Sequence, residues 1–567
     1  MTALSVSASG PAADAIGDAV PRLVEDRFAS KLFARDATLW GPNAESESAK
    51  RLSWVGLARS SRPLVGEVAA LRDQLAEKGI DHVVLCGMGG SSLAPEVICA
   101  TEGKPLVVLD SSDPDYVRAA LRDQLDRTVV VVSSKSGSTV ETDSQRRAYE
   151  GAFTDAGIDP TERIVIVTDP GSPLDQQSRE TGYRVINADP DVGGRYSALT
   201  AFGLVPSGLA GVDIEALLDD AESVADLLAA DDDANPALRL GAAIGATTPL
   251  RDKLAIVDDG SGIVGFADWA EQLIAESTGK NGTGILPVVV GDAQDPEVRW
   301  PAPDVTVARL VATDSDDSDV PESTDTDLVV VDSSRSEIAV GGSLGAQMLM
   351  WEVAVAAAGR LLGINPFDQP DVESAKAAAR ELLDKGLSSA AAPAATDGAV
   401  EIRTMGGDGD WLGGATTIAG ALDALFAQLD PSQGYVAVMA YLDRLEDAAL
   451  AQCRRTIALR TERPTTFGWG PRFLHSTGQF HKGGPAVGVY LQITTVPHED
   501  LSIPGREFTF GDFIAAQAGG DAAVLADHGR PVLQLHLTDH DAGLAQVEKV
   551  LGVGASVAGA AGTRGDS

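Results

Sequence analysis

The sequence predicts an α/β protein in which two doubly wound parallel sheets follow each other and a smaller α/β domain comes after them. Short, continuous apolar runs recur along the chain, and segments of helix length separate them. Strands that are apolar at every position are buried on both faces, which happens when helices cover both sides of a parallel sheet. The chain has 567 residues, 44% of them hydrophobic, and this length suits two or three domains.

Changes in composition divide the chain into consecutive segments. We expect an N-terminal tail and helix at 1–45, a first sheet domain at 46–240, a second at 241–387, a linker at 388–398, a C-terminal α/β domain at 399–551 and a disordered tail at 552–567. The linker prediction rests on the sequence SSAAAPAATDG, which is small, polar and marked by proline.

Hydrophobic spacing predicts the individual elements. Amphipathic helices are expected at 20–40 and 53–78. The strands of the first sheet are expected at 82–86, 106–110, 128–132, 164–168 and 183–186. The second domain has expected strands at 254–257, 285–290, 305–311 and 328–331, with helices at 264–278 and 344–362. Further α/β elements are expected at 417–428, 435–442, 487–494, 509–519 and 532–537.

Charge and composition exclude several function classes. A formal charge of −39 excludes a broad basic face for nucleic acid. No apolar run approaches the ~18–20 residues of a membrane span, and residues 1–14 lack the pattern of a secretion signal. The three cysteines, Cys86, Cys99 and Cys453, have no CxxC or paired spacing, which indicates a reducing compartment and no metal cluster. We therefore expect a cytoplasmic enzyme without a nucleic-acid or membrane partner.

The stretch 133–142, SSKSGSTVET, follows an apolar strand and has the composition of a phosphate-binding loop. A helix that begins here leaves its first backbone N–H groups unpaired at the positive end of its dipole. Gly137 has no Cβ to hold a phosphate away from the backbone. Hydroxyl and ammonium donors are available from Ser134, Lys135, Ser136, Ser138 and Thr139. A serine-rich turn that only caps a helix remains an alternative, because capping favours the same residues.

A glycine-rich turn, GMGGSS at 87–92, follows the strand expected at 82–86. Its glycines permit positive φ, and it is expected beside 133–142 at the carboxyl ends of neighbouring strands, where open α/β sheets bind ligands. The turn lacks the GxGxxG pattern and an obvious ribose-binding acid, so a nicotinamide site is the weaker interpretation. A tight turn without a ligand also fits the sequence.

Two charged residues further along are candidates for chemistry. Arg195 follows a diglycine turn in VGGRYS, where its guanidinium can reach across a bound molecule and stabilise an oxyanion. Glu276 lies near the carboxyl end of the helix expected at 264–278, where the helix dipole disfavours its charged form and raises its basicity. A surface salt bridge and a solvated glutamate are the alternatives for the two residues.

A stiff, proline-bracketed turn, NPFDQPD at 365–371, precedes an expected helix that carries Lys376. The turn can hold Gln369 and Lys376 toward a ligand. A surface position is the alternative for Lys376, as it is for most helix lysines.

Taken together and in order, these motifs resemble those of the phosphoglucose isomerase family. They are the diglycine-serine loop, SKSGSTVET, GGRYS, EQLIAESTGK and INPFDQPDVESAK, which lie between Cys86 and Lys376. Members of this sugar isomerase family have two flavodoxin-like domains. The segment 470–485, GPRFLHSTGQFHKGGP, looks like the end of the isomerase module that is fused to transaldolase in some bacterial bifunctional proteins.

The resemblance implies an aldose–ketose isomerase that interconverts glucose 6-phosphate and fructose 6-phosphate through a cis-enediol, without metal or cofactor. It implies that Ser134, Lys135, Ser136 and Thr139 hold the sugar phosphate and that Gly90 and Ser91 line the sugar. It makes Glu276 the base between C1 and C2 and places Arg195 against the enediolate. Gln369 and Lys376 would lie near the ring oxygen and the phosphate. An isomerase of mannose 6-phosphate and a non-catalytic sugar-phosphate sensor are the alternatives.

The sequence departs from the family in its histidines. The family's ring-opening histidine is expected between the glutamate and lysine motifs, but residues 280–376 contain no histidine. His475 and His481 stand later in the chain, where TGQFH echoes the family's glycine-glutamine-histidine turn. We expect one of them to enter the site from the C-terminal domain. The expected partner is a small-molecule sugar phosphate, and the sequence leaves both a monomer and a homodimer open.

Overall fold

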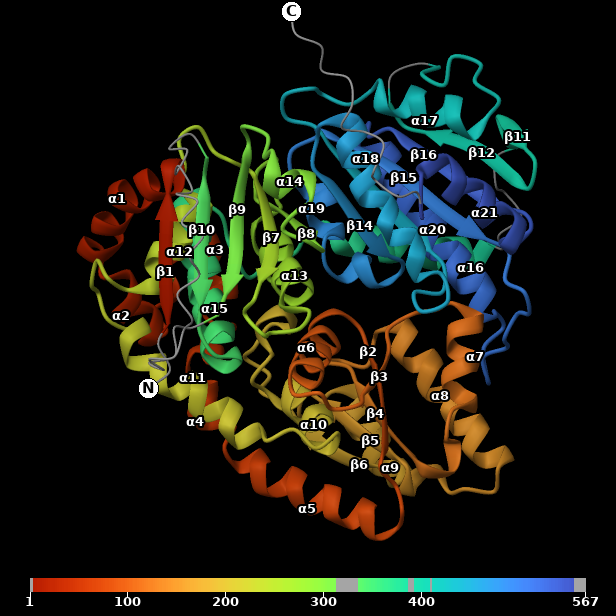
Figure 1. Cartoon of the computed structure of the whole chain (residues 1–567). Helices are drawn as coiled ribbons and strands as arrows, with labels where there is room; N and C mark the ends of the chain where they lie inside the picture. Colours follow the sequence, from red (N-terminus) through yellow and green to blue (C-terminus); the bar gives the residue numbers. More distant parts are fainter. Residues whose placement is uncertain (1–3, 313–334, 386–391, 408–409, 555–567) are drawn as a thin grey trace, which may run out of the picture.

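The structure is a computed structural model that describes residues 4–312, 335–385, 392–407 and 410–554, without the side chains of Val372, Glu373, Ala375, Lys376, Asp384 and Lys385. It contains three sheets, each with helices packed on it (Figure 1). The fold is α/β throughout, as predicted. The strand predicted at 328–331 and most of the predicted tail lie outside the described residues.

The first sheet is fully parallel and has the strand order β3-β2-β4-β5-β6. Its strands are β2 (His82–Gly87), β3 (Val107–Leu109), β4 (Thr128–Ser133), β5 (Ile164–Thr168) and β6 (Arg184–Asn187). Alternate residues of β2 enter different cores: Val83 and Leu85 lie in one, Val84 and Cys86 in the other. The helices whose residues fill these cores include α5 (Pro63–Glu77), α6 (Leu93–Thr101) and α10 (Ala201–Leu209) on one face and α7 (Pro114–Arg122) and α8 (Val140–Asp155) on the other.

The second sheet has the order β1-β10-β9-β7-β8 and is parallel except at one edge. Its strands are β1 (Ser5–Ser9), β7 (Lys253–Asp259), β8 (Leu286–Val290), β9 (Val305–Val311) and β10 (Glu337–Gly341). Its main helices are α12 (Pro236–Gly245), α13 (Phe266–Thr278) and α15 (Leu344–Leu362). The segment predicted as an N-terminal tail thus contains strand β1, which pairs antiparallel with β10 at the sheet edge (Figure 1).

The two long N-terminal helices predicted from amphipathic spacing are interrupted. Residues 20–40 belong to α1 (Gly10–Glu25), α2 (Phe28–Phe33) and a 3₁₀ turn, because Arg27 adopts a left-handed conformation with φ 56°. Residues 53–78 divide into a 3₁₀ turn, the short α4 (Leu57–Ser60) and α5. Pro63 begins α5, since proline suits the first turn of a helix and not its interior.

The third sheet has the order β11-β12-β16-β15-β13-β14 and is mixed. Its strands are β11 (Ala395–Asp397), β12 (Val400–Met405), β13 (Tyr435–Tyr441), β14 (Thr465–Trp469), β15 (Gly488–Thr495) and β16 (Val532–Leu537). Its helices are α16 (Val372–Lys385), α17 (Ile418–Phe426), α18 (Cys453–Thr461), α19 (Gly478–Gly483), α20 (Phe510–Asp527) and α21 (His540–Leu551). The end of the predicted linker therefore forms strand β11, and 386–391 lie outside the described residues.

The three parts share their cores. One hydrophobic cluster contains residues of the first and second sheets, and another joins the second sheet to the third. Helix α13 contacts elements of all three, namely α6, β8 and α19. A site at the junction of the three domains would therefore lie next to α13. No helix among the described residues is long and apolar enough to cross a membrane.

Candidate active site

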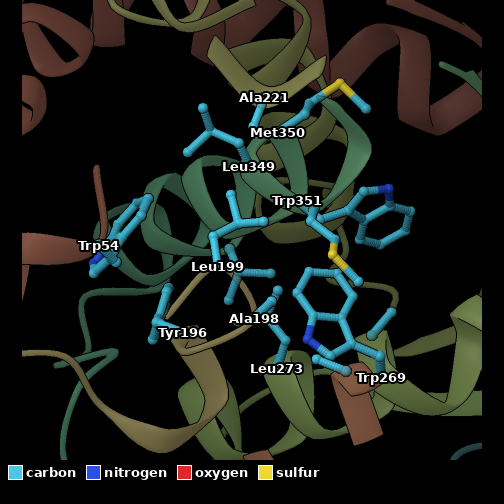
Figure 2. Close-up of a cluster of buried hydrophobic side chains, with 14 of the residues drawn as sticks. Trp54, Tyr196, Ala198, Leu199, Ala221, Trp269, Leu273, Leu349, Met350 and Trp351 are labelled. Carbon is cyan, nitrogen blue, oxygen red and sulfur yellow. The ribbon is translucent and has the colours of Figure 1, made fainter. Parts of the chain in front are cut away.

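Glu276 lies in the last turn of α13 and is only 5% exposed. The helix is held by its apolar side, where Trp269 and Leu273 lie in the same buried cluster as Trp351 of α15 (Figure 2). It ends at Gly279, where a Cβ would lie 2.6 Å from the Cα of Phe480 in α19. The second and third sheets thus meet at the end of α13 that carries the carboxylate. A solvated surface position for Glu276 is excluded.

Arg195 binds this end of the helix from the first domain. It is 3% exposed, and its Nη1 lies 3.3 Å from Glu276 Oε2 while its Nε donates to Ser277 Oγ at 2.9 Å. Its other bonds go to the turn after α15: Nη1 to Gln369 Oε1 (2.8 Å), and Nη2 to the carbonyl oxygens of Pro366 (2.7 Å) and Asp368 (3.0 Å). Arg195 is therefore a buried cross-link between three segments and not a surface cation.

The position of Arg195 follows from its neighbours in the 3₁₀ turn Gly194–Tyr196. Tyr196 stacks on Trp54 with ring centroids 5.0 Å apart, in the buried cluster of Figure 2. Gly90 packs against the same turn so closely that a Cβ on it would lie 1.9 Å from the carbonyl oxygen of Gly194. The glycine loop predicted to line the sugar, with Gly90 and the partly buried Ser91, therefore supports the arginine turn directly.

Lys280 also binds the turn that holds Gln369. The ammonium of Lys280 donates to the carbonyl oxygens of Asn365 and Asp368 and pairs with Asp368 Oδ1 at 2.7 Å. Lys376 lies in the following helix, α16, but its side chain is outside the described residues. The structure thus brings Gln369 to Arg195 and leaves the predicted role of Lys376 a prediction.

The predicted phosphate loop lies between β4 and the first turn of α8, with Thr139 at the N-cap position. Its hydroxyls are close together: Ser134 Oγ lies 3.4 Å from Thr139 Oγ1, and Ser136 Oγ lies 2.7 Å from Ser138 Oγ. Ser136 and Ser138 are exposed. Small hydroxyls at the N-terminus of a 16-residue helix suit an anion.

Two residues of this loop behave differently from the sequence interpretation. The ammonium of Lys135, which the sequence offers as a donor to the phosphate, pairs with Asp169 at 2.7 Å and donates to the carbonyl oxygens of Pro190 and Val192. Gly137 has φ +80°, and a Cβ on it would lie 2.6 Å from Cβ of Leu174, so the packing of α9 (Pro173–Thr181) requires glycine here. The loop is therefore shaped by its own domain as well as by any ligand.

His475 reaches the same loop from the third domain. Its Nε2 lies 3.0 Å from Oε1 of Glu141, which belongs to the first turn of α8. Gln517 of α20 also donates to this oxygen, at 2.8 Å. When the Glu141 carboxylate is ionised it only accepts hydrogen bonds, and Nε2 of His475 then carries the hydrogen of this contact. The backbone oxygen of His475 accepts from Gln272 of α13 at 2.8 Å, which ties the histidine to the helix that carries Glu276.

His481 lies in a different environment. It is 2% exposed in α19, its Nδ1 lies 3.0 Å from the hydroxyl of Tyr435, and its ring stacks on that of Tyr435. Burial and the charges of Lys482 and Arg530 hold the pKa of His481 well below its ordinary value, so the ring is neutral. Of the two histidines singled out in the sequence, the structure places His475 beside Gln272 and Glu141 and places His481 in the core of the third domain.

Three side chains that the motifs did not single out also take part in these contacts: Glu141, Gln272 and Ser277. Gln272 precedes Glu276 by four residues, so both lie on one face of α13, and this spacing is a signal that the sequence carries. Glu141 lies two residues after Thr139 in the phosphate motif. Glu141, at the end of the loop 133–142, contacts His475, and the backbone of His475 contacts α13. On the same helix, Glu276 contacts Arg195. The cluster can hold an anion at one end and exchange protons at the other.

The fold that carries these residues is that of a solved sugar isomerase. A hypothetical protein from Thermus thermophilus has the same fold, with a TM-score of 0.56 and 23% identity over 67% of this chain and 100% of that one. The glucose-6-phosphate isomerase of Chlamydia trachomatis aligns with a TM-score of 0.51 and 21% identity, covering 65% of this chain and 85% of that one.

Sequence comparison identifies the family within this class. Residues 68–280 match the phosphoglucose isomerase family. A probable glucose-6-phosphate isomerase of Haloarcula marismortui is 31% identical over 341 residues, which cover 53% of this chain and 78% of the relative. The corresponding protein of Natronomonas pharaonis is 31% identical over 372 residues, covering 58% of this chain and 86% of the relative. The chain belongs to the phosphoglucose isomerase family.

Proposed function

We propose that this chain interconverts glucose 6-phosphate and fructose 6-phosphate through a cis-enediolate, with Glu276 as the base. The observation that carries the proposal is the buried contact between Glu276 and Arg195. Isomerisation requires one group to remove a proton from the carbon next to a carbonyl and to return it to the neighbouring carbon, and a positioned carboxylate contributes about 10²–10⁴-fold. The guanidinium 3.3 Å away can stabilise the negative oxygen that develops meanwhile.

Each group has a role in the proposed reaction. The loop hydroxyls of Ser134, Ser136 and Thr139 and the N-terminus of α8 hold the phosphate. His475 moves a proton through Nδ1 during ring opening, while Glu141 fixes its tautomer through Nε2. Glu276 then takes the C2 proton of the aldose, and the resulting enediolate faces Arg195. Return of the proton to C1, with protonation of O1 and loss of the O2 proton, gives the ketose.

Within the chain, the third domain supplies His475 next to Glu141 of the first domain. A monomer and a homodimer are both compatible with the proposal. The cytoplasmic location remains a prediction.

The proposal is tested by a coupled assay of fructose 6-phosphate conversion, together with exchange of the substrate C2 proton with deuterated water. The wild-type protein should exchange the proton, and Glu276→Gln should abolish exchange while it still binds substrate. Glu352→Gln is the matched control, because Glu352 is a 1% exposed carboxyl of α15 whose burial raises its pKa well above the ordinary value. This neutral acid should tolerate an amide.

The result also separates the alternative functions. A sugar-phosphate sensor would bind substrate without any exchange in the wild-type protein. An isomerase that prefers mannose 6-phosphate would turn over that aldose faster than glucose 6-phosphate. Normal exchange in Glu276→Gln would remove the proposed mechanism.

A further inference from the structure

Lys280 is a buried cation that the steps above do not use. It is 1% exposed and follows α13 directly, four residues after Glu276. Its ammonium has three hydrogen-bond donors, and three acceptors surround it: the carbonyl oxygens of Asn365 (2.8 Å) and Asp368 (2.5 Å) and Oδ1 of Asp368 (2.7 Å). All three donors of Lys280 are therefore used, and these hydrogen bonds hold the turn 365–368 in place.

The acceptors of Lys280 belong to the turn that also holds Arg195. The carbonyl oxygen of Asp368 accepts from both Lys280 Nζ (2.5 Å) and Arg195 Nη2 (3.0 Å). The next residue, Gln369, accepts from Arg195 Nη1. Any shift of the turn therefore changes the position of both Gln369 and the guanidinium.

The backbone of Lys280 is itself fixed relative to Glu276. Lys280 and Thr283 exchange two backbone hydrogen bonds of 3.1 Å, and the oxygen of Gly279 accepts from Gln479 of α19 at 2.9 Å. Gly284 closes this turn with φ +132°, where a Cβ would lie 2.5 Å from the carbonyl oxygen of Thr278. The ammonium is thus held at a set distance from the end of α13.

We propose that Lys280 is a positioning residue for the isomerisation: its ammonium holds the turn 365–368 in place, and through that turn it sets Arg195 and Gln369 against Glu276. The inference rests on the proposed function, because it requires Glu276 and Arg195 to act on the substrate. It differs from a purely structural role in that loss of the ammonium should slow turnover in protein that remains folded.

The surroundings of Lys280 make the role sensitive to pH. Burial and then the charge of Arg195 lower the pKa of Lys280 to about 8, against the opposing effect of Asp368 and Glu276. The charged side chains of α19 are directed elsewhere, His481 to Tyr435 and Lys482 to Asp521. Deprotonation above this pH removes the charge and one donor, so the hold on the turn weakens as the pH rises.

The test compares Lys280→Met, Lys280→Arg and a matched control, Lys253→Met. Lys253 is 0% exposed and also binds carboxylates and a carbonyl oxygen, those of Asp252, Asp304 and Gln433, but it lies at the start of β7. We measure kcat and KM between pH 6.5 and 9.5 and the melting temperature of each variant.

We expect the kcat of the wild-type protein to fall above about pH 8. Lys280→Met should lower kcat roughly 10–100-fold at pH 7, with a smaller effect on KM, and should lack this alkaline fall. Lys280→Arg should move the fall to higher pH, because a guanidinium stays protonated. Lys253→Met should lower the melting temperature and leave the pH profile unchanged.

An unchanged kcat in folded Lys280→Met, or the same alkaline fall in both Lys280 variants, would overturn the positioning role. If Lys280→Met does not fold, Lys280→Arg decides the question by whether the fall moves. Activity retained by Glu276→Gln would remove the proposed function and this inference together. Loss of activity in Glu276→Gln with an unaltered Lys280 profile would remove this inference alone.

Discussion

The two ends of the candidate site are built in opposite ways. The phosphate loop is one short stretch of chain, and its hydroxyls at Ser136 and Ser138 are exposed and bonded to each other. The cluster around Arg195 is buried and joins residues 81 and 174 positions apart in the sequence, Glu276 and Gln369. The proposed phosphate site is thus encoded locally, whereas the contacts around Arg195 and Glu276, proposed for proton transfer, exist only after the domains have packed.

This difference has an energetic consequence. Exposed hydroxyls exchange one hydrogen-bond partner for water at small cost, so changes in the loop should affect binding and little else. Removing one partner from a buried, fully bonded group leaves an unsatisfied polar atom, which costs about 1–3 kcal/mol or more for charged groups. Changes in the buried cluster should therefore lower turnover and stability together.

After Glu276→Gln, the largest effect is expected for Arg195→Lys. Lysine has three donors and no planar fork, so it cannot satisfy the five acceptors of Arg195. Turnover should fall by about 10²–10³-fold, and the melting temperature should fall as well. Steady-state kinetics and thermal unfolding measure both. Arg184→Lys is the control, since Arg184 is exposed and pairs with Glu67 at 3.5 Å. If Arg195→Lys turned over substrate at the wild-type rate, the proposed difference between the exposed loop and the buried cluster would be contradicted.

A smaller and selective effect is expected for His475→Asn. If His475 opens the sugar ring, the variant should slow the closed-ring substrate by on the order of 10²-fold and leave the open-chain form less affected. The measurement is the ratio of the two rates in stopped-flow assays. His481→Asn should lower the melting temperature without changing this ratio, because His481 packs on Tyr435. Equal slowing of both substrate forms in His475→Asn would refute the ring-opening role.

Thr139→Val tests the loop itself. It removes one hydroxyl near the proposed phosphate and retains the shape of the side chain. A hydrogen bond to a charged group is worth about 1.5–3 kcal/mol, so KM should rise roughly tenfold or more. Turnover at saturation and the melting temperature should stay near the wild-type values. Thr154→Val is the control, because Thr154 lies at the other end of α8 and bonds to Glu150. A fall in kcat with unchanged KM would show that the loop takes part in the chemistry.

The smallest effect on turnover is expected for Glu271→Gln, which tests the pH response of the buried region. Burial and the nearby Asp268 raise the pKa of Glu271 from 4.5 to about 8. Between these values the folded state binds more protons than the unfolded state, so its stability falls as the pH rises through this range. The variant lacks this loss. Its melting temperature relative to wild type should therefore increase from pH 5 to pH 8. If the difference in melting temperature between Glu271→Gln and the wild-type protein did not change with pH, the raised pKa of Glu271 would be contradicted.

The sequence predicts the first sheet well because its strands are buried on both faces. Strands β2, β4 and β5 are continuous runs of valine, isoleucine and leucine, and their ends lie within one residue of the predicted positions. Strand β1 was missed because SVSAS has no such run, and only its pairing with β10 makes it a strand. The break at Arg27 was missed because the apolar spacing continues across it.

The site divides in the same way into parts that a local pattern predicts and parts that depend on contacts between distant residues. The loop 133–142 could be identified from strand, turn and helix-cap chemistry within one stretch. The contacts of Arg195 with Glu276 and Gln369 could not, because no local rule relates residues so far apart, and only the resemblance to the family brought them together. The contact between His475 and Glu141 spans 334 positions and depends on the packing of a third domain. Gly137 shows the converse, since the close approach of Leu174, a contact that the local sequence does not reveal, already requires glycine there.

Strand β1 constrains the order of events while the ribosome makes this protein. Ser5–Ser9 pair with Glu337–Gly341, and translation proceeds at about 5–20 residues per second. The first strand therefore waits for a large part of a minute, with its hydrogen-bonding groups facing water, until its partner emerges. All of the first sheet is synthesised in that interval. The first sheet therefore has time to form before β1 pairs with β10 and completes the edge of the second sheet.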